Sequence, residues 1–234
     1  MKNIKDHYLK KSDEYGWGLK SAQLDPERII ELNRFVIGET VLDIGCATGV
    51  YIDYLAQKGF KATGVDFVPD FIEYAKTHRE GEFLKADAAM LPFKDSSFDT
   101  VILFDILEHL DDEKVLKEAT RVAKKRIIAA FPQKTNGSID SFGLVYRHHL
   151  DTSHLRVYTK EDIEKLFSKL KLNIITIKGI TYVDSIGLLK KLINFHSVFL
   201  TKALVKILRI IARIQNFPTE LLIVAEKKDD QNSH

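Results

Sequence analysis

The stretch Val41-Leu-Asp-Ile-Gly-Cys-Ala-Thr-Gly49 decides the fold of this chain. Its apolar residues predict a buried strand over residues 40–44, and a helical pattern begins at about Val50. Small residues at positions 45, 47 and 49 let the backbone between strand and helix approach a ligand closely. The first turn of the following helix offers N–H donors. The stretch therefore indicates a ligand-binding turn, although a strand–turn–helix unit without a ligand is an alternative for this motif alone.

Two known phosphate-binding motifs fit the same stretch poorly. A dinucleotide fingerprint needs glycines at positions 45, 47 and 50, where this chain has Gly45, Ala47 and Val50. A P-loop ends in Gly-Lys-Ser/Thr, which is absent from this turn. A nicotinamide-dependent oxidoreductase is therefore disfavoured by the spacing of the small residues.

Short apolar runs alternate with helical patterns through most of the chain, which is typical of βα units and a parallel sheet. Strands are expected over residues 40–44, 61–65, 83–85, 99–104, 126–130, 173–183 and 219–225. Helices are expected from Asp25-Pro26 onward and over residues 50–58, 69–78, 111–123 and 163–170, the last preceded by a capping-box variant at Thr159. We expect one α/β domain over residues 1–234.

The composition is that of a globular protein, with 234 residues, 45% hydrophobic residues and a formal net charge of +2. This charge argues against a protein that mainly coats nucleic acid. The single cysteine, Cys46, excludes an internal disulfide framework. We find no secretory signal pattern at the start and no apolar run long enough to span a bilayer, and we therefore expect a cytoplasmic protein.

Three further motifs that contain acidic residues follow the first motif in order and at suitable spacing. Asp66 ends the second expected strand, Asp87-Ala88 follows the third, and Phe98–His109 contains the fourth strand and the polar residues after it. Each acid alone is more simply explained as a solvated turn at a strand end. Their occurrence together at suitable spacing favours a common ligand site.

This set of motifs resembles the class I S-adenosylmethionine-dependent methyltransferases, in particular the methyltransferase type 11 group. The resemblance covers residues 35–180 and the final strand. It implies a Rossmann-like, doubly wound, seven-stranded sheet with an antiparallel last strand, and S-adenosyl-L-methionine as cofactor. The ligand is then expected beyond the carboxyl ends of the strands.

The resemblance also implies a role for individual residues. Gly45, Ala47 and Gly49 would face the methionine and ribose parts of the cofactor, and Asp43 would organise their turn. The remaining cofactor-binding residues are expected to be Asp66 at the ribose, Phe67 at the adenine, Asp87 and Ala88 at the base edge, and Phe104 and Asp105 beneath the methionine.

Glu108 and His109 are the candidate catalytic residues, because a histidine titrates near neutral pH and can remove a proton from the acceptor. The alternative is an ion pair at a helix start beside a packed histidine. We expect His149, His154 and Arg156, in a long segment without clear periodicity, to bind the acceptor, although an exposed polar loop explains them nearly as well. No metal site is expected, because partners with ligand spacing are missing from the sequence around these histidines.

Residues 185–217 are expected to form an apolar-basic helical insertion, because they contain six Lys or Arg residues and no acid. It could lie on an anionic membrane surface, or serve as a lid or dimer surface. Residues 1–35 are expected to form a helical arm. Its aromatic residues Tyr8, Tyr15 and Trp17 could close over the cofactor, although aromatic residues more commonly fasten such an arm to the core.

The sequence thus favours an enzyme that methylates an O, N or C nucleophile on a small or lipid-like acceptor. An RNA methyltransferase that uses the basic insertion, and a non-catalytic cofactor-binding scaffold, are the alternatives.

Overall fold

In the computed structural model, residues 8–10, 12, 18–19, 22–134, 151, 153–182 and 218–228 are described. The insertion at 185–217, His149 and 15 of the 35 residues of the N-terminal arm therefore lie outside the described residues. No helix in the described part of the chain combines the length and the apolar character that crossing a bilayer requires.

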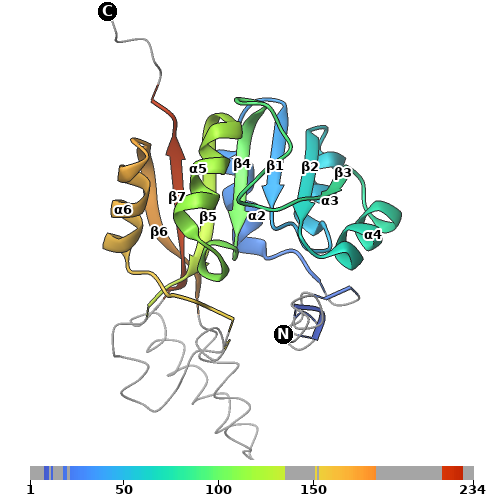
Figure 1. The fold of residues 1–234 in the computed structure, drawn as a ribbon, viewed down its shortest axis with the longest axis horizontal. Coiled ribbons are helices and arrows are strands. Elements are labelled where there is room, and N and C mark those ends of the chain that lie inside the picture. Colours follow the sequence, from blue (N-terminus) through green and yellow to red (C-terminus); the bar gives the residue numbers. More distant parts are fainter. Residues whose placement is uncertain are drawn as a thin grey trace, which may run out of the picture.

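Seven strands form one sheet in the order β3-β2-β1-β4-β5-β7-β6 (Figure 1). Strands β1 to β5 pair in parallel, and β7 runs antiparallel to both β5 and β6. The strands are β1 (Thr40–Ile44), β2 (Lys61–Asp66), β3 (Glu82–Lys85), β4 (Phe98–Phe104), β5 (Ala123–Pro132), β6 (Asn173–Tyr182) and β7 (Pro218–Glu226). The expected seven-stranded α/β sheet with an antiparallel last strand is confirmed.

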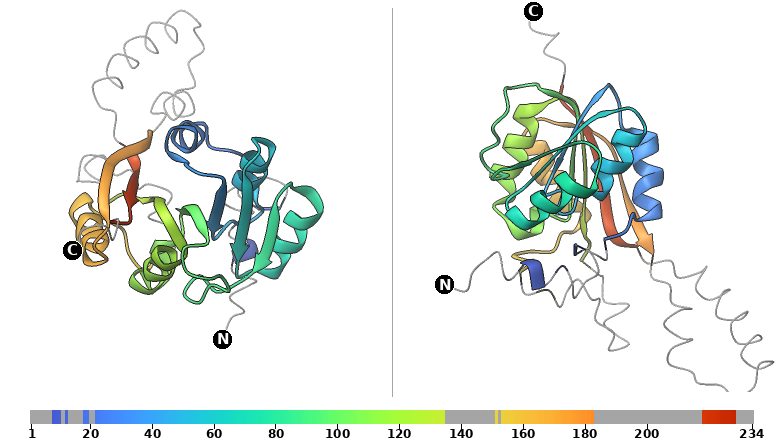
Figure 2. Two further views of the ribbon diagram at one scale, coloured as in Figure 1. Left: turned by 90° about the horizontal axis from the view of Figure 1, so that it is seen from above. Right: turned by 90° about the vertical axis from the view of Figure 1, so that its right-hand side faces the viewer.

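Helices cover both faces of this sheet (Figure 2). They are α2 (Pro26–Phe35), α3 (Val50–Gln57), α4 (Pro69–His78), α5 (Asp112–Val122) and α6 (Lys160–Lys169), with a 3-10 turn, η1 (Leu107–His109), after β4. Alternate side chains of a strand point to opposite faces. In β4, Leu103 accordingly packs with the core beneath α5 and α6, and Ile102 packs with the core beneath α2, α3 and α4. Because both faces are buried, residues 101–104 of β4 form a continuous apolar run.

Local sequence signals set where α2 and α6 begin. The carboxylate of Asp25 accepts the backbone N–H groups of Glu27 and Arg28 at 2.8 and 2.9 Å. At α6, Thr159 and Asp162 form the expected capping box, in which each side chain accepts the other residue's N–H. Both devices satisfy N–H groups that have no partner within the helix.

Strand β5 begins three residues earlier than expected, at Ala123, and α5 ends at Val122. Ala123 pairs with Phe98 of β4, and Lys124 forms an ion pair with Asp99 at 3.3 Å. The basic run that begins at Lys124 hid the start of this strand, because a buried strand was expected to be apolar. Sheet pairing outweighed the local pattern here.

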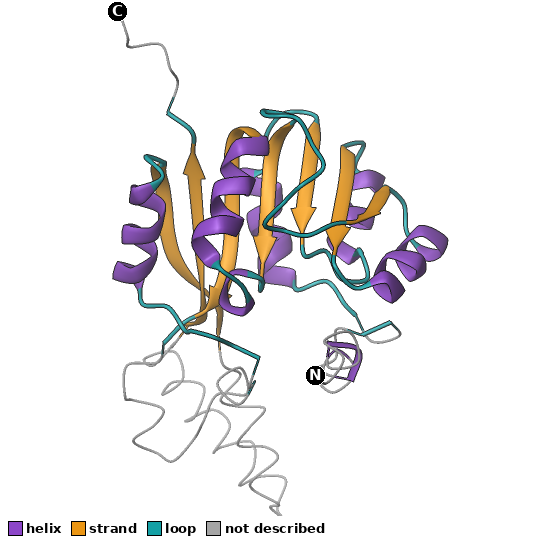
Figure 3. Cartoon of the chain, viewed as in Figure 1, coloured by secondary structure: helices purple, strands orange, loops and turns teal. Residues whose placement is uncertain are grey.

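The turns that leave β1, β2 and β4 lie at one edge of the sheet, since these strands are parallel neighbours (Figure 3). After β1, both Gly45 and Gly49 have positive φ, at +80° and +76°. A Cβ atom on Gly45 would lie 2.7 Å from Cδ1 of Ile106, and one on Gly49 would lie 2.4 Å from Cε1 of Phe83. Ala47, between them, also has a positive φ of 45°. The small residues in this turn are thus required by backbone conformation and by close packing.

We expect Gly49→Ala to destabilise the fold by about 2–5 kcal/mol. The left-handed conformation costs a residue with a Cβ about 1–2 kcal/mol, and overpacking against Phe83 adds about 1–3 kcal/mol. Urea denaturation of the purified chain measures this free energy of unfolding.

Gly59→Ala is the matched control, because Gly59 also has a positive φ, +91°, but a Cβ there meets nothing within 4 Å. It should show the backbone effect alone, about 1–2 kcal/mol. Equal losses of stability in the two variants would contradict the close approach of Gly49 to Phe83.

Candidate active site

Acidic side chains gather at the carboxyl edge of the sheet. They are Asp43, Asp66, Asp105, Glu108 and Glu220. Glu220 belongs to this edge because β7 is antiparallel, so that its first residues lie beside the last residues of β5. Burial, and next the charge of Asp66, raise the pKa of Asp43 to about 7, while the positive charge of Arg28 opposes this rise. This edge therefore holds more carboxylate groups than the single positive charge of the buried Arg28 can neutralise.

Asp66 joins the end of β2 to the turn after β1. Its Oδ2 accepts the N–H of Ala47 at 2.9 Å, and its Oδ1 accepts the N–H of Val68 at 2.8 Å. Burial raises the pKa of Asp66, and its backbone hydrogen bonds counteract this effect. A carboxylate offers about four acceptor positions. Asp66 can thus fix the turn and still accept hydrogen bonds from a ligand.

Phe67 and Asp87 follow the ends of the neighbouring strands β2 and β3. The side chain of Phe67 is 55% exposed, which is unusual for a large apolar ring, and the ammonium of Lys85 lies 5.7 Å from its centroid. The carboxylate of Asp87 accepts the N–H of Ala89 at 2.9 Å, which makes a local turn, and Ala88 between them is buried. The exposed ring of Phe67 and the carboxylates of Asp66 and Asp87 thus border the same part of the edge.

Arg28 of α2 is buried, and no pattern in the sequence singles it out. Its Nη2 atom lies 2.7 Å from Oδ2 of Asp105 and 2.8 Å from Oε2 of Glu220. Burial alone would lower the pKa of Arg28, but the two carboxylates raise it above its ordinary value. An arginine on an amphipathic helix ordinarily faces solvent, so the sequence held no signal for this contact.

The Arg28 guanidinium also covers Phe104, at 5.0 Å from the ring centroid, and Tyr51 packs edge-on against the same ring at 5.2 Å. Phe104 is therefore buried under these two side chains. Asp105, expected beside it, has a positive φ of 51° and its carboxylate is held by Arg28. The two residues form a fixed surface at the end of β4.

Glu108 lies in η1 and is fully buried. Neither of its carboxylate oxygens has a hydrogen-bond partner among the described residues. Burial, and next the charge of Asp105, raise its pKa well above the ordinary value. An ion pair at a helix start, the alternative from the sequence, does not describe this environment. A buried polar group without a partner is costly and usually has a functional reason.

His109 is oriented by residues from a distant loop. Its Nδ1 lies 3.1 Å from Oγ of Ser153, and the Ser153 hydroxyl donates to Oδ1 of Asp151 at 2.6 Å. Because a hydroxyl has one proton to donate, Ser153 accepts from His109, so Nδ1 carries the imidazole proton. Rings of Tyr8 and His154 pack edge-on against His109 at 5.8 and 4.7 Å.

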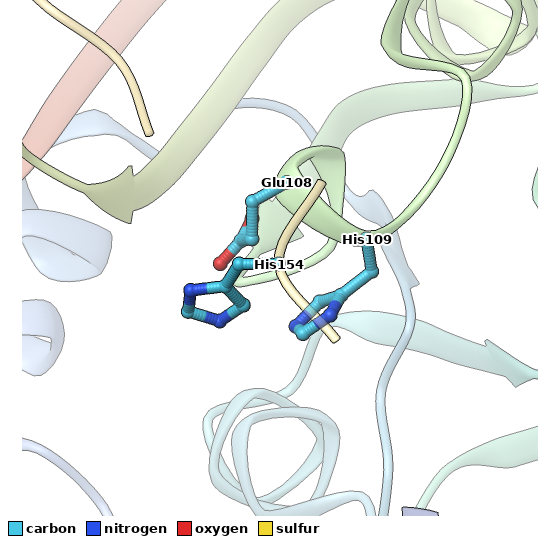
Figure 4. A group of neighbouring side chains, drawn as sticks. All are labelled: Glu108, His109 and His154. Carbon is cyan, nitrogen blue, oxygen red and sulfur yellow. The ribbon is translucent and has the colours of Figure 1, made fainter. Parts of the chain in front are cut away.

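Glu108, His109 and His154 come together at this point (Figure 4), with one ligand atom from each lying within 4.8 Å of the others. His154 is 45 residues beyond His109 in the chain, so local spacing could not reveal this cluster. We call Glu108, His109 and His154 the Glu-His-His cluster.

Arg156, expected to bind the acceptor, fastens this loop to η1. It donates to the carbonyl of Leu107 at 3.2 Å and lies 3.3 Å from Oδ2 of Asp112, while the N–H of Leu155 donates to the carbonyl of Glu108 at 2.8 Å. These contacts position the cluster, and direct acceptor binding by Arg156 stays a prediction. His149, Tyr15 and Trp17 lie outside the described residues.

Comparisons with known proteins agree with this architecture. Residues 42–131 match the model of the family described as Methyltransferase domain. The chain is 36% identical over 129 residues to the demethylmenaquinone methyltransferase of Thermotoga maritima, covering 50% of this chain and 56% of that protein. It is 25% identical over 162 residues to the ubiquinone biosynthesis O-methyltransferase of Idiomarina loihiensis, covering 63% and 67%. The chain thus spans little more than half the length of the first of these relatives.

Solved structures share the fold. A SAM-dependent methyltransferase from Archaeoglobus fulgidus aligns with a TM-score of 0.64 at 21% identity, over 95% of this chain and 100% of that one. The magnesium protoporphyrin IX methyltransferase of Synechocystis, solved with bound SAH, aligns with a TM-score of 0.63 at 18% identity, over 96% and 98%.

We expect Arg28→Met to destabilise the fold by about 3–5 kcal/mol at neutral pH, because it leaves the buried carboxylate of Glu220 and the partly buried carboxylate of Asp105 without their counter-ion. The loss should shrink at acidic pH, where protonation removes the unpaired charge. Urea denaturation at several pH values measures both effects.

Arg34→Met is the control, since Arg34 lies exposed on the same helix. A loss of stability that is equal for the two variants, or that does not change with pH for Arg28→Met, would contradict the structural role of the buried guanidinium.

Proposed function

We propose that this chain, whose residues 42–131 match the family described as Methyltransferase domain, is a class I S-adenosylmethionine-dependent methyltransferase that transfers a methyl group to an O, N or C nucleophile on a small or lipid-like acceptor. One observation carries the proposal. The exposed ring of Phe67 follows the Asp66 carboxylate directly, at the end of β2 and next to the small-residue turn of β1.

The residues at this edge fit the donor. An exposed ring offers a surface on which an adenine can stack, and the Asp66 carboxylate retains acceptor positions for ribose hydroxyls. When bound, the donor supplies a methyl group activated by a sulfonium. The chain's part is to hold it: Gly45, Ala47 and Gly49 would contact its methionine and ribose parts, Asp87 and Ala88 the base edge, and Asp43, Phe104 and Asp105 the methionine end.

The acceptor is proposed to bind at the Glu-His-His cluster, beyond the Asp105 turn. His109 would take the acceptor's proton, and the hydrogen bond from its Nδ1 to Ser153 leaves Nε2 as the basic nitrogen. Holding donor and acceptor in line can lower the barrier by on the order of 7–11 kcal/mol. His149, His154 and Arg156 are the proposed acceptor-binding residues.

The class of acceptor is supported by the relatives, one named a demethylmenaquinone methyltransferase and the other a ubiquinone biosynthesis O-methyltransferase. Both names indicate small, hydrophobic acceptors. Contact of residues 185–217 with a membrane surface or with a second copy of the chain would suit such an acceptor, and both stay predictions from the sequence.

The test uses methyl-labelled donor with fractionated cell extract. We expect label in a small molecule that partitions into organic solvent. Phe67→Ala should weaken donor binding by roughly 5- to 150-fold in calorimetric titration, because stacking of a base on an aromatic ring contributes about 1–3 kcal/mol.

Ile30→Ala is the matched control, as Ile30 is a similarly exposed apolar residue, 61% exposed, on α2. It should bind the donor like the wild type.

Label in RNA would refute the proposed acceptor class, and donor binding without transfer to any fraction would indicate a scaffold. Unchanged donor affinity in Phe67→Ala would contradict the proposed site.

A further inference from the structure

We propose that the Glu-His-His cluster, formed by Glu108, His109 and His154, is a binding site for a divalent transition-metal ion. One potential ligand atom from each residue lies within 4.8 Å of the other two (Figure 4). Bonds from Zn²⁺ to nitrogen or oxygen are about 2.0–2.2 Å long, so ligand atoms around one ion lie about 3–4 Å apart. Small side-chain rotations would therefore close the cluster around an ion.

The environment of Glu108 is the independent observation that points to a cation. The carboxyl group is fully buried, and neither oxygen is hydrogen-bonded within the described part of the chain. An ionised carboxylate in this position is strongly destabilised unless a positive charge approaches it. A neutral carboxyl would still leave its O–H without an acceptor. A bound divalent cation would satisfy both oxygens and the charge.

The surroundings of His109 resemble the outer shell of a metal site. A histidine that binds a metal through one ring nitrogen commonly donates from the other nitrogen to a polar partner, which fixes the ring orientation. His109 donates from Nδ1 to Ser153, and Ser153 donates in turn to Asp151. Nε2 is then the ligand atom, and Ser153 and Asp151 are positioning residues.

Two imidazoles and one carboxylate specify the kind of ion. Nitrogen ligands suit Zn²⁺ and other first-row transition ions, whereas Mg²⁺ and Ca²⁺ prefer oxygen ligands. Three protein ligands also leave a coordination position for water or for a substrate oxygen, as in catalytic zinc sites. The site is thus suited to chemistry as well as to holding the loop on η1.

The consequence for catalysis rests on the proposed function. A bound cation lowers the pKa of a hydroxyl that coordinates it. The acceptor's O–H bond would break with loss of the proton to solvent, the oxygen would bond the methyl carbon, and the C–S bond of the donor would break. In the cation-bound protein His109 serves as a ligand instead of a base. The substrate class is accordingly narrowed to acceptors with a hydroxyl group.

The experiment is a titration of the full, chelator-treated chain with Co²⁺ alone, followed by visible absorption and calorimetry. We expect one Co²⁺ per chain with the absorption bands of an ion bound by nitrogen. Glu108→Gln and His154→Ala should each weaken binding by at least about 10-fold. His78→Ala is the control, because His78 is exposed on α4, and it should bind like the wild type.

Circular dichroism of each variant shows whether it has folded, and if Glu108→Gln has not, His154→Ala decides. Absence of stoichiometric binding, or equal affinity in wild type and a folded cluster variant, would overturn the proposal. Phe67→Ala should retain Co²⁺ binding while losing donor affinity. Failure of the donor site and failure of the metal site are therefore distinguishable.

Discussion

The buried guanidinium of Arg28 is the interaction on which this edge of the molecule depends. It links α2 to the turn after β4 through Asp105 and to β7 through Glu220. These elements are distant in the sequence but adjacent at the carboxyl edge of the sheet. Without a cation between them, two carboxylates would be brought together in a partly dehydrated space, which is strongly unfavourable. Arg28 thus permits Asp105 to occupy its turn, and Glu108 follows three residues later.

Arg28 neutralises only part of the negative charge at this edge, and the remaining carboxylates give the site an excess of negative charge. The raised pKa values of Asp43, Asp66 and Glu108 have a common first cause, burial, and neighbouring acids add to it for Asp43 and Glu108. Such an edge attracts cations. A sulfonium donor and a divalent metal ion are both cations, so the same charge imbalance fits the proposed donor at one end and the proposed metal ion at the other.

Features determined by short segments could be predicted from the sequence. The bounds of β1, the cap of α2 and the capping box of α6 depend on residues within a few positions of one another, and the structure has them as expected. The turn at residues 45–49 was also predictable, because positive φ and close packing restrict it to small residues.

Features that depend on distant contacts could not be predicted. Arg28 meets Glu220 across 192 positions, and Ser153 meets His109 across 44. An arginine on a helix and a serine in a polar loop carry no local sign of such partners. The Glu-His-His cluster has no local signal for the same reason, since His154 is separated from Glu108 and His109 by more than 40 positions and only the fold brings the three together.

The location of the donor is the central claim, and a crystal structure of the chain with S-adenosylhomocysteine tests it most directly. We expect the ribose hydroxyls to be hydrogen-bonded to Asp66 and the purine to lie on the ring of Phe67, at the carboxyl ends of β1 and β2. The nucleoside bound at another surface, with Phe67 still exposed to solvent, would contradict the claim.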